Sequence, residues 1–215
     1  MENPTNNLVT DPERLQASET PKVAAPPVGA PPVAFDREKA AAVVLTWPDD
    51  ALTTQAARWL WAHLRPDRIW TVRAKGSVDV VRCRVVADLC LKAPPQVEEF
   101  ILMDRDMRPD AATEPFLQAA GDVVACQYPV PDMRTWGRPQ AMHMGLVRVK
   151  RKVLETLAAE RDAAGRQIPL FFFPRTPDGG QVTACECAWF AERIRKAGFS
   201  IVRAGWCGHD TVKER

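Results

Sequence analysis

The sequence has little net charge and no long apolar run. Its 215 residues carry a formal net charge of +2, which gives no strong electrostatic reason to expect a nucleic-acid or membrane partner. No apolar run approaches the ~20 residues that a membrane-spanning helix needs, and the start of the chain has no apolar stretch like that of a signal peptide. We therefore expect a cytoplasmic protein with one globular domain.

The six cysteines include no C-x-x-C pair. Most of them fall in apolar or helix-like stretches, so we expect reduced thiols that pack as small apolar side chains. A zinc site could be drawn from four residues, Cys185, Cys187, Cys207 and His209. Their spacing is C-x-C followed by C-x-H. Zinc sites do not usually have that spacing, and a zinc centre is not favoured.

Residues 1–35 are rich in proline and alanine. Two Pro-Pro pairs lie among alanine, asparagine, threonine and glutamate, and these residues offer too little apolar surface to offset the entropy lost on ordering. We predict a disordered tail at 1–35 and a folded domain at 36–215.

Within the predicted domain, short apolar runs alternate with stretches of helical apolar spacing. Apolar residues make up 46% of the chain, enough for a sizeable core. The alternation predicts an α/β fold with parallel strand pairing and right-handed crossovers. Strands are predicted at 41–46, 69–73, 100–103, 123–128 and 199–204, with a further strand or loop-strand at 142–149.

Helices are predicted between these strands from their capping residues. Asp49 or Asp50 begins the first helix, which runs to about Leu64. The next spans 77–91, and a short one begins at Asp110 or Thr113 and ends at Gly121. Further helices are predicted at 150–164 and 185–197, and residues 205–215 are predicted as a tail that carries His209.

Asp104 and Asp106 follow the buried strand predicted at 100–103. Side chains at i and i+2 of an extended segment point to the same side, so the two carboxylates can face one small volume. They would repel each other unless a cation or a shared proton lay between them, and Mg²⁺ or Mn²⁺ suits such oxygen ligands. The alternative is an aspartate-rich turn that continues through Pro109 and Asp110.

Several segments together resemble compact GT-A glycosyltransferases of the family 2 type, which use a nucleotide-sugar donor and a D-x-D motif. The resemblance covers about 41–209 and rests on the order and spacing of its pieces. These are V-V-L-T-W-P-D-D at 43–50, V-D-V-V-R-C-R-V-V-A-D-L at 78–89, F-I-L-M-D-R-D-M-R-P-D at 100–110, H-M-G-L-V-R-V-K-R-K-V-L-E at 143–155 and A-C-E-C-A-W-F-A-E-R-I-R-K-A-G-F-S-I at 184–201, followed by Gly208-His209.

The resemblance implies a Rossmann-like three-layer α/β sandwich with a mostly parallel central sheet. It also implies a hexosyltransferase that takes a sugar from a uridine diphosphate donor with the help of Mn²⁺ or Mg²⁺. The metal ligands would be Asp104, Asp106 and His209. The donor would lie against Thr46, Pro48, Asp49, Arg82 and Asp104.

This chain departs from the family pattern at residue 187, where Glu186-Cys187 stands in place of the usual Glu-Asp. The aspartate of that pair often serves as the base in inverting members. Glu186 is therefore our candidate general base, and its alternative role is a helix-terminal carboxylate favoured by the helix dipole. Arg82 and Arg84 could reach phosphates or line a solvated helix face, and Trp136 could stack on a sugar or anchor a loop.

Other classes remain open at this point. A haloacid-dehalogenase-type phosphohydrolase also carries D-x-D after an apolar strand, with the first aspartate as nucleophile. A nucleotidyltransferase would usually have a glycine-rich loop where this chain has Trp47-Pro48-Asp49-Asp50. A non-catalytic nucleotide-sugar binding domain would explain the missing aspartate at 187.

The acceptor hydroxyl is not specified by the sequence. A modified base in phage DNA is one candidate, because some members of the family glucosylate such bases. A cluster of basic residues could contact a phosphate backbone, although charged helix faces are usually just solvated. It consists of Arg148, Lys150, Arg151, Lys152, Arg193 and Arg195.

Overall fold

The computed structural model describes residues 35–46, 52–128 and 142–210. The predicted tail at 1–35 lies almost wholly outside the described residues, as do Pro48, Asp49 and Trp136. None of the described helices is both long enough and apolar enough to cross a membrane.

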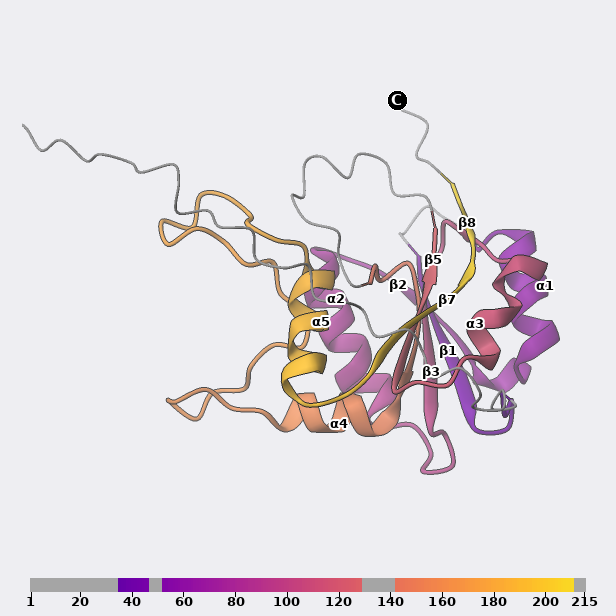
Figure 1. Ribbon diagram of the computed structural model, residues 1–215, viewed down its shortest axis with the longest axis horizontal. Helices are drawn as coiled ribbons and strands as arrows, with labels where there is room; N and C mark the ends of the chain where they lie inside the picture. Colours follow the sequence, from indigo (N-terminus) through magenta and orange to yellow (C-terminus); the bar gives the residue numbers. More distant parts are fainter. Residues whose placement is uncertain (1–34, 47–51, 129–141, 211–215) are drawn as a thin grey trace, which may run out of the picture. The chain divides into compact units, whose positions relative to one another are not determined.

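A six-stranded sheet forms the centre of the domain, in the order β2-β1-β3-β6-β5-β7 (Figure 1). The pairs β1–β2, β1–β3 and β5–β7 are parallel, and β6 runs antiparallel between β3 and β5. The strands span Ala40–Thr46 (β1), Ile69–Arg73 (β2), Glu99–Asp104 (β3), Val123–Gln127 (β5), Leu146–Lys150 (β6) and Ile201–Trp206 (β7).

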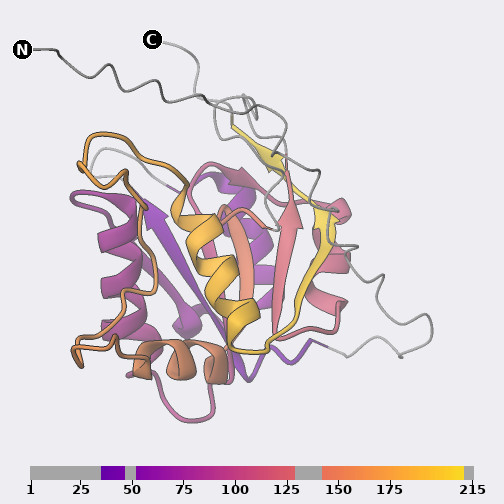
Figure 2. The ribbon, with the colours of Figure 1, turned by 60° about the vertical axis from the view of Figure 1, so that its left-hand side comes forward.

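Helices cover both faces of the sheet, with α2, α4 and α5 on one side and α1 and α3 on the other (Figures 1 and 2). Alternate residues of each strand point to opposite faces, so Val43 packs with α2, α4 and α5 whereas Val44 packs with α1 and α3. The predicted fold class is confirmed: a three-layer α/β sandwich with a mostly parallel central sheet. The helices span Thr54–His63 (α1), Val78–Val85 (α2), Glu114–Gln118 (α3), Arg151–Ala159 (α4) and Glu186–Lys196 (α5).

Strand β6 is the antiparallel member of the predicted mostly parallel sheet. An antiparallel neighbour needs no helical crossover from the preceding strand, and β6 lies directly beside β5. The orientation has a consequence for function. The amino end of β6 meets the carboxyl end of β3, where the amide of Asp104 donates a hydrogen bond to the carbonyl of Gly145 at 2.8 Å.

Several predicted helix ends are also wrong. Thr53 begins α1, and its hydroxyl accepts a hydrogen bond from the amide of Ala56 at 3.2 Å. The helix predicted at 77–91 is α-helical only to Val85 and continues as a π-turn, Val86–Cys90. Helix α3 ends at Gln118, before Gly121 is reached.

Helix α4 ends at Ala159 because the segment after it forms a turn organised by Asp162. The Asp162 carboxylate accepts from the amides of Ala164 and Arg166, both at 2.9 Å. Gly165 sits in this turn with a φ of +76°. Aspartate side chains offer the backbone an alternative to helical hydrogen bonds, and this competition was not visible in the apolar spacing.

The predicted tail at 205–215 is instead structured as far as Asp210. Strand β7 extends to Trp206, and a short strand β8, Gly208–His209, pairs antiparallel with β4, Met107–Arg108. Gly205 has a φ of +73°, and a Cβ there would lie 3.0 Å from the Phe116 amide nitrogen and the Thr113 carbonyl oxygen. This glycine lets the chain pass against α3 and return to the turn after β3.

Gly205→Ala should therefore lower the free energy of unfolding by more than Gly198→Ala, as measured by chemical denaturation. Both glycines have positive φ, which costs a non-glycine residue about 1–3 kcal/mol. A Cβ at Gly198 meets nothing within 4 Å, whereas one at Gly205 meets the backbone near α3. An equal loss in the two variants would show that close approach to α3 is not a constraint.

Candidate functional site

The carboxyl ends of three adjacent parallel strands define one edge of the sheet. Strands β2, β1 and β3 end there at Arg73, Thr46 and Asp104. In open α/β sheets ligands bind at this edge. Thr46 is buried and its hydroxyl donates to the carbonyl of Val72 at 3.5 Å, so the predicted donor contact at this residue would have to come from its backbone or from a side-chain rearrangement.

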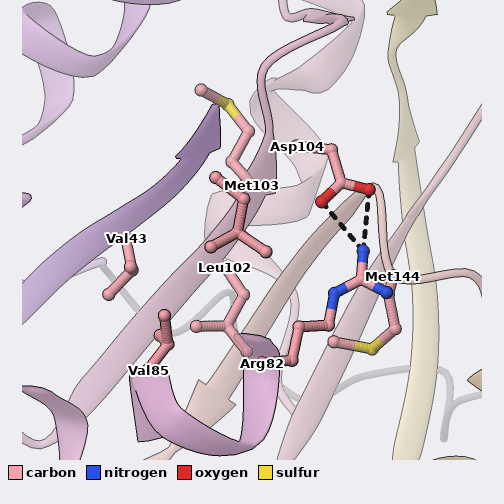
Figure 3. Close-up of a pocket in the computed structure, with 8 residues that line it drawn as sticks. Val43, Arg82, Val85, Leu102, Met103, Asp104 and Met144 are labelled. Atoms are coloured by element: carbon pink, nitrogen blue, oxygen red, sulfur yellow. Dashed lines mark hydrogen bonds and ion pairs between the residues drawn. The ribbon is translucent and has the colours of Figure 1, made fainter. Parts of the chain in front are cut away.

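Arg82 on α2 joins two carboxylates at this edge. Its Nη2 donates to both oxygens of Asp104 at 2.8 Å, and its Nη1 pairs with Glu186 at the start of α5 (Figure 3 shows the Asp104 contact). Arg82 and Glu186 are buried, and Asp104 is about one third exposed. One positive and two negative charges therefore lie together where the chain leaves the sheet.

The carboxylates hold Arg82 in its charged form. Burial disfavours a guanidinium cation, but the charges of Asp104 and Glu186 outweigh this, and the pKa of Arg82 is raised. Burial raises the pKa of Asp104, the Arg82 charge opposes the rise, and the charges of Asp106 and Glu186 add to it. Charged and hydrogen-bonded partners in a water-poor site interact strongly, so this group restrains α2, β3 and α5 together.

An apolar cavity lies directly under the Arg82–Asp104 pair (Figure 3). Its volume is about 10 Å³, which is room for about one water molecule. Val43, Val85, Leu102 and Met144 contribute to its walls. The cavity is too small for a nucleotide, so a donor would have to lie on the outer side of the Asp104–Arg82 pair.

Asp106 and His209 form a second pair beside this group. Asp106 Oδ2 lies 3.3 Å from His209 Nε2, and the β4–β8 pairing brings the two residues together. The imidazole stacks on Tyr128 with 5.3 Å between ring centroids, and the Tyr128 hydroxyl accepts from the Gly145 amide at 2.9 Å. A Cβ on Gly145 would lie 2.6 Å from the Tyr128 ring, so glycine is required at that position.

Asp106 and His209 both carry side-chain atoms of the kind that bind a divalent cation. Asp106 Oδ1 and His209 Nδ1 are buried and have no hydrogen-bond partner among the described residues. Two ligand atoms bound at right angles to one ion at about 2.1 Å lie about 3.0 Å apart, close to the observed separation of Oδ2 and Nε2. Carboxylate oxygen and imidazole nitrogen both suit Mn²⁺ or Mg²⁺.

Asp104 does not join this pair in the present arrangement. The strand ends at Asp104 and a turn follows, so the rule that i and i+2 share a side does not extend to Asp106. Within the described ranges, one group of three metal-ligating side chains has all its ligand atoms within 4.8 Å of one another, and it is Cys185, Glu186 and Cys187. The proposed ligands Asp104, Asp106 and His209 are thus neighbours without a common centre.

Cys187 packs inward with Phe190 and Ile194, in line with the expectation that the thiols pack as small apolar side chains. Its thiol lies 3.6 Å from Glu186 Oε1. A hydrogen bond with Cys185, burial and the Glu186 charge raise the pKa of Cys187 well above its usual value. All six cysteines are free thiols, which confirms that prediction.

The basic cluster predicted as a surface for DNA is largely committed to contacts within the domain. Arg148 pairs with Glu99 at 2.7 Å, Arg193 pairs with Glu160, and Arg151 donates to the carbonyls of Ala93, Pro94 and Val97. Lys150 and Lys152 both pair with Asp122. Arg148, Arg151 and Arg193 are therefore held within the domain, whereas Lys152 and Arg195 are exposed, and DNA as the acceptor stays a prediction.

The residues that sequence reasoning missed are Tyr128 and Gly145, which position His209. Arg82 was predicted as a phosphate ligand, and its pairing with two carboxylates was not foreseen. Arg84 is exposed, in line with the alternative of a solvated helix face. The signal for Tyr128 was weak: it is the single tyrosine of the chain, and it directly follows a buried strand.

Solved structures with a similar arrangement include A197 from STIV, with a TM-score of 0.49 and 13% identity over 79% of this chain and 83% of that one. A mannosyltransferase from Pyrobaculum calidifontis in complex with GDP-Man and Mn²⁺ has a TM-score of 0.48 and 16% identity over 85% of this chain and 60% of that one. A proposed nucleotide-diphospho-sugar transferase from Desulfovibrio desulfuricans G20 has a TM-score of 0.37 and 11% identity, and this chain covers 63% of it. No protein-family model and no curated protein matches the sequence.

Arg82→Met should lower the free energy of unfolding by about 3–5 kcal/mol, because it leaves the buried Glu186 and the neighbouring Asp104 without their cation. The matched control is Arg84→Met on the exposed face of the same helix, for which a change within about 0.5 kcal/mol is expected. Urea unfolding measures both. Similar stabilities of the two variants would contradict a structural role for the shared guanidinium.

Proposed function

We propose that this chain is a metal-dependent inverting glycosyltransferase that moves a hexose from a uridine diphosphate sugar to an acceptor hydroxyl. The observation that carries the proposal is the meeting of Arg82, Asp104 and Glu186 at the carboxyl edge of the sheet, with Asp106 and His209 beside them. The reaction needs an anion-binding group for the diphosphate, ligands for a cation and a base for the acceptor. These residues offer each of the three.

The diphosphate of the donor would be bound by two positive charges, a metal ion and the Arg82 guanidinium. Asp106 and His209 would hold Mn²⁺ or Mg²⁺, and Asp104, whose two oxygens accept from Arg82, would join them through a water molecule. When bound, the ion stabilises the negative charge that develops on the diphosphate leaving group. Arg82 contributes a fixed positive charge, and the turn after Thr46, with Pro48 and Asp49, is the proposed contact of the nucleoside.

The acceptor side requires a base, and Glu186 is the proposed one. It lies at the start of α5, where the helix dipole favours a carboxylate. Cys187 is a poor alternative, because its raised pKa keeps the thiol protonated and only a thiolate could accept a proton. In the arrangement described above, Arg82 engages Glu186, and a diphosphate that shares the guanidinium would release the carboxylate for proton transfer.

One base and one displacement imply inversion of the anomeric centre. The acceptor hydroxyl attacks the sugar carbon opposite the leaving diphosphate while Glu186 takes the hydroxyl proton. The product therefore has the opposite anomeric configuration to the donor. Retention would require a second displacement and a protein nucleophile, for which this proposal has no candidate.

The haloacid-dehalogenase alternative is less well supported. Its first aspartate must present a carboxylate oxygen as nucleophile, and both oxygens of Asp104 accept hydrogen bonds from Arg82. Non-catalytic binding of a nucleotide sugar is the stronger second candidate. The observation that favours it is the contact of Glu186 with Arg82, which would suppress proton acceptance if it persisted with the donor bound.

Glu186→Gln should lower the turnover number by about 10²–10⁴-fold with little change in donor affinity, because it removes the proton acceptor. Cys187→Ala is the matched control and should retain most of the activity. Transfer rates with Mn²⁺ and a uridine diphosphate sugar measure both, with circular dichroism to verify folding. An active Glu186→Gln together with an inactive Cys187→Ala would reverse the assignment of the base.

Asp106→Asn should abolish the metal-dependent part of donor binding and leave the fold intact, since it removes one charged ligand. Isothermal titration with uridine diphosphate sugar, with Mn²⁺ and with chelator, gives the comparison. Asp88→Asn, an exposed carboxylate paired with Lys92, is the control and should bind the donor as the native protein does. Equal donor affinity in Mn²⁺ and in chelator would remove the metal from the proposal.

A further inference from the structure

The start of α5 carries two thiols and a carboxylate in consecutive residues. The ligand atoms of Cys185, Glu186 and Cys187 all lie within 4.8 Å of one another, and all three residues are buried. We propose that these residues bind one Zn²⁺ ion, separately from the hard-cation pair of Asp106 and His209. This set differs from the C-x-C and C-x-H arrangement that the sequence did not favour, because its third ligand is a carboxylate and neither Cys207 nor His209 takes part.

The spacing of the ligand atoms suits a tetrahedral ion. With Zn–S near 2.3 Å and Zn–O near 2.0–2.2 Å, the sulfur–oxygen edge of a tetrahedral site is about 3.5 Å. The Cys187 thiol donates to Glu186 Oε1 at 3.6 Å, which is close to that edge, and Arg82 Nη1 contacts the same oxygen, so the ion would share this oxygen with the guanidinium or bind the other one. Three protein ligands leave the fourth position for water, which is the arrangement of open zinc sites.

The ligand chemistry separates this site from the one proposed for the donor. Thiolates are soft ligands that select Zn²⁺, whereas carboxylate and imidazole with bound water suit Mg²⁺ and Mn²⁺. Arg82 lies against Glu186 and would repel an isolated cation. Burial and a hydrogen bond with Cys185 raise the pKa of Cys187, and a thiol binds a metal ion as the thiolate, so metal binding displaces its proton.

Charge balance removes the objection raised by Arg82. Without metal, the buried group of Arg82, Asp104 and Glu186 has a net charge of −1. Zn²⁺ together with two thiolates adds no net charge to this group, so the net charge stays at −1. No additional net charge is buried, and Arg82 remains the counter-ion of the ligand Glu186.

The local fold prepares the two sulfur atoms. Cys185 is the N-cap residue of α5, with extended backbone, and its sulfur accepts from the Ala188 amide at 3.3 Å. Cys187 lies inside the first turn of the helix. The backbone changes from extended to helical between the two cysteines. This change brings both sulfur atoms and the Glu186 carboxylate close together. A continuous strand would point the side chain of residue 186 away from the other two.

The first experiment titrates the full-length reduced protein with Co²⁺, a spectroscopic substitute for Zn²⁺, and follows the thiolate-to-cobalt charge-transfer band. One equivalent should produce the band, and Zn²⁺ should remove it. Cys185→Ser should abolish the band without loss of folding, because serine is a better N-cap residue than cysteine but a hard ligand. Competition with a chromophoric chelator should show that Cys185→Ser binds Zn²⁺ at least about 100-fold more weakly than the native protein does. Loss of an outer-shell partner alone lowers metal affinity by about 10–100-fold, and this variant loses a direct ligand.

Two control variants locate the site. Cys207→Ser alters a second thiol, one that interacts with Cys126, and should retain the band. Asp106→Asn alters the proposed hard-cation pair and should retain it as well. The proposal is overturned by the absence of a band in the native protein, by a band that persists in Cys185→Ser, or by its loss in Cys207→Ser.

A consequence for activity rests on the proposed function. Zinc would occupy the carboxylate of Glu186, so it should inhibit sugar transfer at saturating Mn²⁺, and the ratio of rates with and without Zn²⁺ should be closer to one in Cys185→Ser. A protein that binds cobalt through thiolates and shows no transferase activity would leave the zinc site standing and refute the proposed function. Transferase activity without a cobalt band would do the reverse.

Discussion

The shared guanidinium of Arg82 is the interaction on which the site depends. It connects α2 to the end of β3 through Asp104 and to the start of α5 through Glu186, residues separated by 22 and 104 positions in the sequence. One cation does not neutralise two carboxylates, so the group of Arg82, Asp104 and Glu186 keeps a net negative charge. That residual charge makes the region receptive to further cations, and Asp106 adds to it from the neighbouring turn.

The antiparallel strand β6 links the fold to this chemistry. Because its amino end meets the carboxyl end of β3, Met144 closes the cavity under Arg82 and the amide of Gly145 donates to the hydroxyl of Tyr128. Tyr128 in turn supports the ring of His209, which β8 has brought to Asp106. A wholly parallel sheet would place the carboxyl end of β6 here, and neither Met144 nor Gly145 would reach the site.

The sequence predicts best what depends on local patterns. The first three strands are predicted to within one or two residues, because each is a short apolar run, and α5 to within one residue, because its apolar spacing ends at Gly198. The strand pairs β3–β6 and β4–β8 depend on distant partners, and the end of α4 depends on a side chain that competes with helical hydrogen bonds. The chemical types at the site could be recognised from the sequence, whereas the partner of each charged group could not.

Cys187 stands where the glycosyltransferases that this chain resembles usually carry an aspartate, and the difference bears on how the proposed site would be controlled. A carboxylate at 187 would add a third negative charge near Arg82, and one guanidinium would then face three anions. A protonated thiol adds no charge, so Arg82 can hold Glu186 and Asp104 firmly when no ligand is present. A diphosphate carries more negative charge than either carboxylate and can compete for the guanidinium, which would couple donor binding to release of the base. The same thiol, together with Cys185, supplies the soft ligands that an aspartate would not, so one substitution underlies both the proposed coupling and the proposed zinc site.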